Sequence, residues 1–171
     1  PTASVSETPT LTFTPIVSPT PIFTSTSIAS PTALPVATLS GQVFAKKPVT
    51  VGLLDLNNTL IVAVLTNPDG TFNLTAPAGT YNVIAKADGY LNAQGPVTLT
   101  LGGTTTKPII TLWAGDIDGN NVIDQFDALT IGMSYNTAAP ASADLNNDGI
   151  INVFDLELLA QNYRKTGPLN W

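Results

Sequence analysis

Short runs in which apolar and polar residues alternate recur between residues 38 and 112. Alternation with a period of two, in segments rich in Val, Ile and Thr, is typical of β-strands that bury one face. Turn sequences separate the runs, among them Asn67-Pro68-Asp69-Gly70 and Pro77-Ala78-Gly79, in which Pro fixes φ and Gly can adopt a positive φ. The runs cover residues 39–44, 49–54, 60–66, 71–75, 81–87, 97–101 and 107–112. Seven short strands with such turns predict a Greek-key β-sandwich.

The pattern changes after residue 112, where a loop rich in oxygen-bearing side chains occurs twice. The first loop spans residues 116–127 and the second spans residues 144–155, so the repeat length is 28 residues. Each loop has twelve residues, with Asp or Asn at positions 1, 3, 5, 9 and 12 and Ile at position 8. Two such loops in register indicate one chemistry that is used twice.

Oxygen ligands at this spacing wrap a hard cation, and the cation expected is Ca²⁺. Position 7 supplies a backbone carbonyl, and position 9 usually reaches the ion through water. The backbone at position 6 favours a positive φ, which Gly149 adopts without steric cost and Asn121 adopts less comfortably. The predicted ligands to two Ca²⁺ ions are Asp116, Asp118, Asn120, Val122, Asp124 and Asp127 in the first loop, and Asp144, Asn146, Asp148, Ile150, Asn152 and Asp155 in the second.

The apolar residues around the loops are expected to form a small core. Ile123 and Ile151 are placed to pair across a short strand bridge, which would join the two loops into one unit. About 58 residues bury little surface, so we expect bound calcium to supply much of the folding free energy. The expected core residues are Ile123, Phe126, Leu129, Ile131, Ile151, Phe154, Leu156 and Leu159.

Residues 114–171 resemble a dockerin, the calcium-binding module of cellulosome-type assemblies. The resemblance rests on Asp at position 12, where an ordinary EF-hand has Glu, on the missing helix before each loop, and on matching residues 28 positions apart, such as Tyr135 and Tyr163. It implies repeats of a loop followed by a helix, here over residues 127–136 and 155–164. Dockerins of this kind often clasp their two ends with an aromatic and a proline, here Trp113 and Trp171 with Pro168. The alternative is a Trp113 packed under the sandwich and a frayed C-terminus.

The resemblance also implies a cohesin as partner, recognised through loop positions 10 and 11 and the helix that follows. These positions hold Gln125-Phe126 and Val153-Phe154, which are bulkier and more apolar than the usual small or hydroxylated pair. The two Phe residues could serve equally well as core or as a fixed contact within the chain.

The expected sandwich resembles the carboxypeptidase regulatory-like or Cna-B-like domains of secreted bacterial proteins. The segments that carry this likeness are Ser40-Gly41-Gln42-Val43, Asn67-Pro68-Asp69-Gly70-Thr71-Phe72, Pro77-Ala78-Gly79-Thr80-Tyr81 and Ala87-Asp88-Gly89-Tyr90. It implies an Ig-like or prealbumin-like fold acting as a spacer or adhesion module, without a shared activity. The expected architecture is thus mainly β with a small α module, in which residues 38–112 form the sandwich and residues 113–171 form the dockerin-like domain.

Residues 1–37 contain nine Thr, six Ser, seven Pro and one charged residue, Glu7. This composition is typical of an extended linker between extracellular domains, which can carry O-glycans. Residues 10–14, however, alternate like a half-buried strand, and the segment is more apolar than a solvated spacer needs. It is therefore either a linker or a binding segment, and the expected partner-binding residues are Leu11, Phe13, Ile22 and Phe23.

Charge and composition narrow the classes of partner. Eight of the 12 acidic residues lie between Asp116 and Glu157, so most of the net charge of −6 is calcium-ligand charge. Six basic residues without a cluster beyond Lys46-Lys47 argue against nucleic acid, and no apolar run is long enough for a membrane span. Weak calcium sites fill where calcium is millimolar, so we expect a bacterial-type extracellular protein whose secretory leader has been removed.

No enzymatic activity is expected, because the chain has no His and no Cys and its sandwich acids lie in turns. Two hypotheses remain. In the first, favoured one, the chain is a structural subunit that assembles head-to-tail into a fibre through its N-terminal segment. In the second, the dockerin-like domain anchors a larger secreted protein by binding a cohesin. N-glycosylation patterns at Asn57-Asn58-Thr59 and Asn73-Leu74-Thr75 are short enough to occur by chance.

Overall fold

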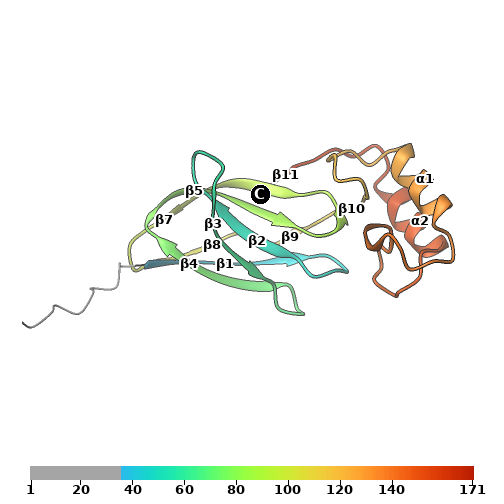
Figure 1. Cartoon of the computed structure of the whole chain (residues 1–171). Coiled ribbons are helices and arrows are strands. Elements are labelled where there is room, and N and C mark those ends of the chain that lie inside the picture. The colour runs from blue at the N-terminus through green and yellow to red at the C-terminus, as the bar shows by residue number, and fades with distance from the viewer. Residues whose placement is uncertain (1–35) are drawn as a thin grey trace, which may run out of the picture. The chain divides into compact units, whose positions relative to one another are not determined.

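Two β-sheets packed face to face form the first part of the structure, a computed structural model that describes residues 36–171 (Figure 1). One sheet contains β1 (Val36–Phe44), β4 (Thr71–Pro77), β8 (Thr104–Thr106) and β9 (Ile110–Thr111). The other has the order β11-β7-β5-β2-β3, with β2 (Thr50–Leu54), β3 (Leu60–Leu65), β5 (Gly79–Lys86), β7 (Ala93–Leu99) and β11 (Leu169–Asn170). The expected class, mainly β with a small α module, is confirmed.

β1 lies in the middle of its sheet and pairs antiparallel with β4 and parallel with β8 and β9. The last of the seven expected runs, residues 107–112, contains only the two-residue strand β9, because Pro108 lacks the N–H that a continuous strand would donate. The strand before it, β8, was not expected. In the turn before β4, Gly70 has a φ of 82° and donates to the carbonyl of Asn67 at 2.8 Å, as its sequence predicts. Gly79 instead begins β5 without a positive φ.

The sandwich core comes from alternate residues of the strands, as the alternation in the sequence predicts. On β4, Phe72, Leu74 and Ala76 are buried, while Asn73 and Thr75 between them are exposed. The same rule buries Val51 and Leu53 of β2, and Val83 and Ala85 of β5. One face of each sheet is therefore removed from water, which supplies most of the driving force for folding.

The second part of the structure holds α1 (Gln125–Met133), a 3₁₀ turn η1 (Ala141–Ala143) and α2 (Val153–Gln161). Each helix begins two residues before the expected start. Position 9 of each loop is the N-cap, since Asp124 and Asn152 each accept a hydrogen bond of 2.8 Å from the backbone N–H two residues later. The position-12 Asp closes a capping box at each start, which satisfies N–H groups that the first helical turn leaves without partners.

The loop–helix part is joined to the sandwich at several points of the chain. β6 (Gly89–Tyr90) pairs with β10 (Ala114–Asp116), and the C-terminal β11 returns to pair parallel with β7. Figure 1 shows this return, with the C-terminus lying over the sandwich. Among the described residues, no helix has the length and apolar character needed to cross a membrane. The expected strand over residues 10–14 and the partner residues Leu11, Phe13, Ile22 and Phe23 lie outside the described residues.

Candidate functional site

The first loop gathers carboxylate oxygens into a small volume. Ligand atoms of Asp116, Asp118 and Asp127 lie within 4.8 Å of one another. The two Asp116 oxygens accept from the backbone N–H of Asn121 at 3.2 and 3.1 Å, and Asn120 accepts from the N–H of Val122 at 2.7 Å. The side chains at positions 1 and 5 thereby stabilise the tight turn of the loop through hydrogen bonds to its own backbone.

The second loop has the same internal pattern. Asp144 accepts from the backbone N–H groups of Asp148 at 3.1 Å and Gly149 at 2.9 Å, and Asp148 accepts from the N–H of Ile150 at 3.0 Å. Position 3 is Asn146, whose amide donates to Asp148 at 2.8 Å. Within residues 36–171, a cluster of three carboxylates forms in the first loop only, since the second loop carries the amide of Asn146 at position 3.

Position 12 fixes the shape of each loop as well as the start of each helix. Asp127 is fully buried, and its oxygens accept from the backbone N–H groups of Ile117 at 2.7 Å, Asp118 at 3.2 Å and Asp124 at 2.8 Å. Asp155 repeats all three contacts in the second loop, at 2.7, 3.1 and 2.8 Å. One carboxylate therefore ties positions 2, 3 and 9 together in both loops.

The backbone enters the left-handed region at two positions of each loop. Position 6 does so as expected, with a φ of 62° at Asn121 and 90° at Gly149. Position 4 does so as well, with a φ of 77° at Gly119 and 60° at Asn147, which the sequence analysis missed. The residue types offered a signal, because Gly and Asn are the residues that most readily adopt this conformation.

Ile123 and Ile151 are both fully buried, but the expected bridge between them is wrong. Ile123 exchanges backbone hydrogen bonds with Arg164 and Lys165, beyond the end of α2, at 2.8 and 2.9 Å. Ile151 exchanges them with Asn136 and Thr137, beyond the end of α1, at 2.8 and 2.7 Å. Each loop is thus hydrogen-bonded to the segment that follows the other repeat's helix, where the backbone N–H and C=O groups are no longer used by the helix. The two repeats form one unit through this reciprocal exchange.

Burial and mutual repulsion oppose the ionisation of the first loop. Desolvation raises the pKa of Asp116, and the nearby Asp127 and Asp118 raise it further, while the N–H of Asn121 lowers it. Desolvation also raises the pKa of Asp127, against three backbone N–H groups that lower it. A bound cation would remove the repulsion, and the donors are carboxylate, amide and carbonyl oxygens, which suit a hard cation such as Ca²⁺. The residues of the site therefore fit calcium.

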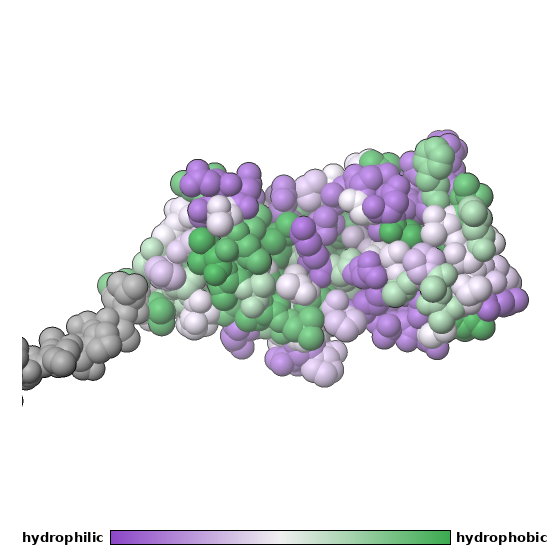
Figure 2. Space-filling view, viewed as in Figure 1, coloured by the Kyte–Doolittle hydropathy of each residue, from purple (hydrophilic) through white to green (hydrophobic). Residues whose placement is uncertain are grey.

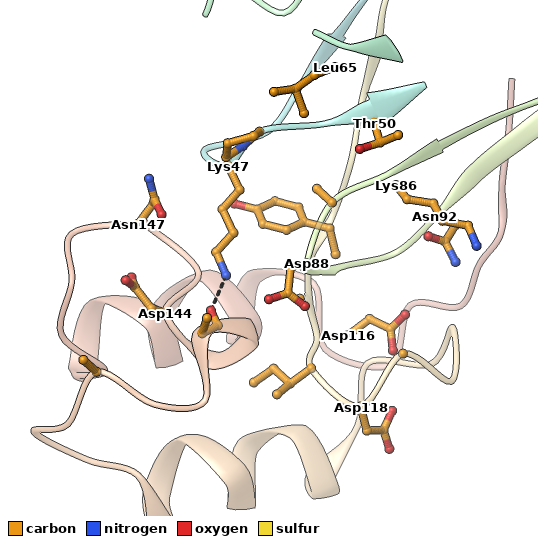
Figure 3. A pocket seen from close by; sticks show the side chains of 18 residues that line it. Lys47, Thr50, Leu65, Lys86, Asp88, Asn92, Asp116, Asp118, Asp144 and Asn147 are labelled. Carbon is orange, nitrogen blue, oxygen red and sulfur yellow. Dashed lines mark hydrogen bonds between the residues drawn. The ribbon is translucent and has the colours of Figure 1, made fainter. Parts of the chain in front are cut away.

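Both loops contact the sandwich directly. The side-chain oxygen of Asn121 accepts from the backbone and side-chain N–H groups of Asn92, and the Tyr90 hydroxyl donates to the carbonyl of Leu145 at 2.7 Å. Lys47 reaches from the sandwich to donate to the Ala141 carbonyl at 2.6 Å, beside Asp88 and Asp144 (Figure 3). These contacts were not foreseen from the sequence, because they join segments far apart in the chain.

The helices expose much of their apolar surface. Phe126 is 59% exposed and Phe154 is 60% exposed, so the expectation that both belong to the core is wrong. Leu129 and Leu156 are also exposed, whereas Ile131 and Leu159 are buried as expected. In each nine-residue helix the core requires only a narrow stripe, which leaves Phe126 and Phe154 facing solvent at equivalent positions of the two repeats.

The two Trp residues do not clasp each other, and the C-terminus is not frayed. Trp171 lies on the sandwich, where its ring meets that of Phe72 edge-on at 5.8 Å between centroids and its indole N–H donates to the Pro108 carbonyl at 2.8 Å. Trp113 instead has the Lys165 ammonium 3.9 Å from its ring centroid. The last residues of the chain therefore fasten the loop–helix part to the sandwich.

Comparison with known proteins agrees with this geometry. The family model of the carboxypeptidase regulatory-like domain matches residues 36–112, and that of the dockerin type I domain matches residues 114–162. No curated protein matches the chain. Dockerin type I domains bind calcium, and both kinds of domain are non-catalytic modules.

Two similar solved structures are a C-terminal and an N-terminal interface mutant of a type II Cohesin-X-Dockerin complex from Acetivibrio cellulolyticus. Each is 25% identical to this chain with a TM-score of 0.60, and the match covers 76% of this chain and 97% of the other. Over residues 36–162, the chain consists of a carboxypeptidase regulatory-like domain followed by a dockerin type I domain.

Proposed function

We propose that the chain is a calcium-loaded docking module that binds a cohesin through the exposed faces of α1 and α2. Each loop holds one Ca²⁺, so the module carries two ions. The side chains at positions 1, 3, 5 and 12 and the position-7 carbonyl act as ligands, with position 9 acting through water. The ligands are Asp116, Asp118, Asn120, Val122, Asp124 and Asp127 for one ion, and Asp144, Asn146, Asp148, Ile150, Asn152 and Asp155 for the other.

Calcium favours docking because it fixes the position of the two helix starts. The charge of each ion offsets the repulsion among the loop carboxylates, and position 12 links the loop to the first turn of its helix. Binding of the ion therefore holds both helix starts in place, and with them the Phe residues at position 11. Dockerin-bearing cellulosome components are extracellular or on the cell surface, where calcium is abundant enough to fill such sites. Secretion of this chain is part of the proposal.

The exposure of Phe126 and Phe154 carries the cohesin proposal. Two bulky aromatic side chains more than half exposed at equivalent positions have no role in the core, and aromatic residues are frequent anchors at protein interfaces. Met133 of α1, Val153 of α2 and Tyr163 just beyond the end of α2 are exposed as well. The match to structures of a Cohesin-X-Dockerin complex supports a cohesin as the occupant.

Titration calorimetry of the full chain with a purified type II cohesin, in millimolar Ca²⁺, tests the proposal. Replacement of both Phe126 and Phe154 by Ala should weaken binding by at least about 30-fold, the effect of losing interface anchors worth about 2 kcal/mol. Leu101→Ala is the matched control, because Leu101 is 62% exposed on the sandwich. Equal binding by the double variant and the wild type would contradict the assignment of this surface, and no heat with a panel of type I and type II cohesins would contradict the partner.

A second function, self-assembly into a head-to-tail fibre, is favoured by one specific observation. The outer face of the five-stranded sheet carries exposed apolar side chains at its β3 edge, on the far side of the sheet from the core. The N-terminal 35 residues supply an apolar segment long enough to reach a neighbouring copy. An interface between the N-terminal segment of one copy and the sandwich of the next does not close on itself, so it grows into a filament. Electron microscopy of the purified full chain tests this, since monomers at all concentrations would contradict it.

A further inference from the structure

β3 is a terminal strand whose residues 62–65 pair with β2 in regular register, and its only irregularity is a register shift next to Leu60, at the start of the strand. It forms the end of the sheet order β11-β7-β5-β2-β3, and its sequence is Leu-Ile-Val-Ala-Val-Leu, without a charge, Pro or Gly. Sheets normally protect such edges with charged residues, prolines, bulges or very short strands. Other terminal strands of the described chain follow this rule, since β11 has two residues, β8 has three and β4 ends in Pro77.

The outer face beside β3 is also apolar and hollowed. Leu60 and Leu65 of β3 are 57% and 64% exposed, and Figure 2 shows the resulting apolar patch on the sandwich. A hollow of about 230 Å³ lies within this patch, where the small residues Gly52 and Ala63 leave room. The lining residues are Thr50, Gly52, Leu54, Leu60, Ala63, Ile84 and Lys86.

We propose that β3 accepts residues 10–14 of a second copy of this chain as an additional strand, with Phe13 lying over Ala63 in the hollow. The proposal rests on the self-assembly function and names its acceptor surface. Leu11 and Phe13 fall on one face of an extended Thr-Leu-Thr-Phe-Thr segment, because side chains alternate between faces. Neighbouring strands lie about 4.8 Å apart, so a Phe ring on the added strand reaches across Ala63 toward the next strand, β2. Pairing also satisfies the free backbone groups of β3.

The path of the chain favours a second copy over the same copy as the donor. β1 begins at Val36, which pairs with Pro77, and ends at Phe44, which shares a hollow with Leu158 of α2. The chain therefore enters the sandwich at the end that lies away from the loop–helix part. Residues 15–35 separate the proposed strand from β1, and extended they span about 70 Å, more than twice the length of a nine-residue strand. Strands paired within one domain are usually joined by far shorter connections.

The test uses two single variants of the full chain in Ca²⁺. Ala63→Lys places a charge in the hollow and disables the acceptor, and Phe13→Lys disables the donor. At a concentration at which the wild type forms filaments, each variant alone should sediment as a monomer of about 17.8 kDa. Mixed in equal amounts, the intact donor of one should pair with the intact acceptor of the other, which gives a dimer of about 36 kDa that grows no further.

Thr98→Lys is the matched control, since Thr98 is exposed on β7 of the same sheet and should leave assembly unchanged. Circular dichroism and a melting curve of each variant establish that it is folded. Filaments formed by folded Ala63→Lys would overturn the assignment to β3 while leaving self-assembly intact, whereas a monomeric wild type would overturn self-assembly itself. A mixture that stays monomeric would overturn a donor from a second copy. Protection from hydrogen exchange of the β3 amides that face away from β2, in monomeric wild type, would place the donor in the same copy.

Discussion

The side-chain oxygen of Asn121 accepts two hydrogen bonds from Asn92, one from its backbone N–H at 3.3 Å and one from its side-chain amide at 3.2 Å. Asn121 occupies position 6 of the first loop, where the second loop has Gly149. Its φ of 62° carries a strain that Gly would not have, but Gly would lack the side chain that reaches the sandwich. The first loop therefore has a more strained backbone at position 6 than the second loop, and its side chain at this position connects the two domains.

Asn121→Gly should remove this contact while keeping the turn at position 6. Asn92→Ala should lower the free energy of unfolding of calcium-bound protein by about 1 kcal/mol, which is typical for one hydrogen-bonding partner. In the Asn121→Gly background the same Asn92→Ala change should have almost no effect, since the partner is already gone. Thermal unfolding of the four proteins checks this, and two fully additive effects would contradict direct coupling.

Asp127→Ala should abolish one calcium site and weaken the start of α1. The substitution leaves the backbone N–H groups of Ile117, Asp118 and Asp124 without their acceptor, and removes the carboxylate from position 12. Calorimetry with Ca²⁺ should show the stoichiometry fall from two to one, and Asp155→Ala should do the same through the second loop. Asp69→Ala is the control, because Asp69 lies in a sandwich turn and should keep the stoichiometry at two.

Removal of calcium should unfold the loop–helix part. The buried carboxylates of the loops repel one another without a cation, and burial already raises the pKa of Asp116 and Asp127. A chelator should lower the helical circular dichroism signal at 222 nm, and Ca²⁺ should restore it where equal Mg²⁺ does not, since Mg²⁺ keeps its waters and a stricter geometry. Unchanged helical signal after chelation would show that the loops fold without metal.

Trp171→Ala should destabilise the calcium-bound protein by about 2 kcal/mol, the combined contribution of an aromatic pair and a hydrogen bond. The melting temperature should fall by roughly 4–8 °C for a chain of this size. Gly95→Ala should have a similar effect from the other side, because a Cβ at Gly95 would overlap the Trp171 carbonyl oxygen. Gly132→Ala adds a Cβ in open space on α1 and should not lower the melting temperature.

The sequence predicts well those features that depend on local pattern. Alternation along β4 places Phe72 and Leu74 inside, and the Asp and Asn spacing of the loops identifies their residues in register. The first residue of each helix could also have been predicted from the sequence. Asp124 followed three residues later by Asp127 is a capping pattern, and it argues for a helix that begins at position 10 rather than position 12.

Features that depend on contacts between distant segments could not be predicted in this way. Both helices have nine residues with apolar side chains on most sides, so their sequence does not reveal which side is buried, and Phe126 was misplaced in the core. Ile123 was expected to pair with its equivalent, but backbone bonds to Arg164 depend on how the two repeats cross. The return of residues 169–171 to the sandwich involves a strand of two residues, which is too short to show an alternation of apolar and polar residues in the sequence.

The central place of β1 also determines how the molecule bears a pull along its length. β1 enters at one end of the sandwich and runs toward the loop–helix part, with hydrogen-bonded neighbours on both sides. A pull applied between Val36 and the loop–helix part acts along this strand, so the hydrogen bonds on both of its sides are sheared together instead of being broken one at a time. Because the C-terminal β11 returns to the same sandwich, the loop–helix part is anchored by a second strand under that load.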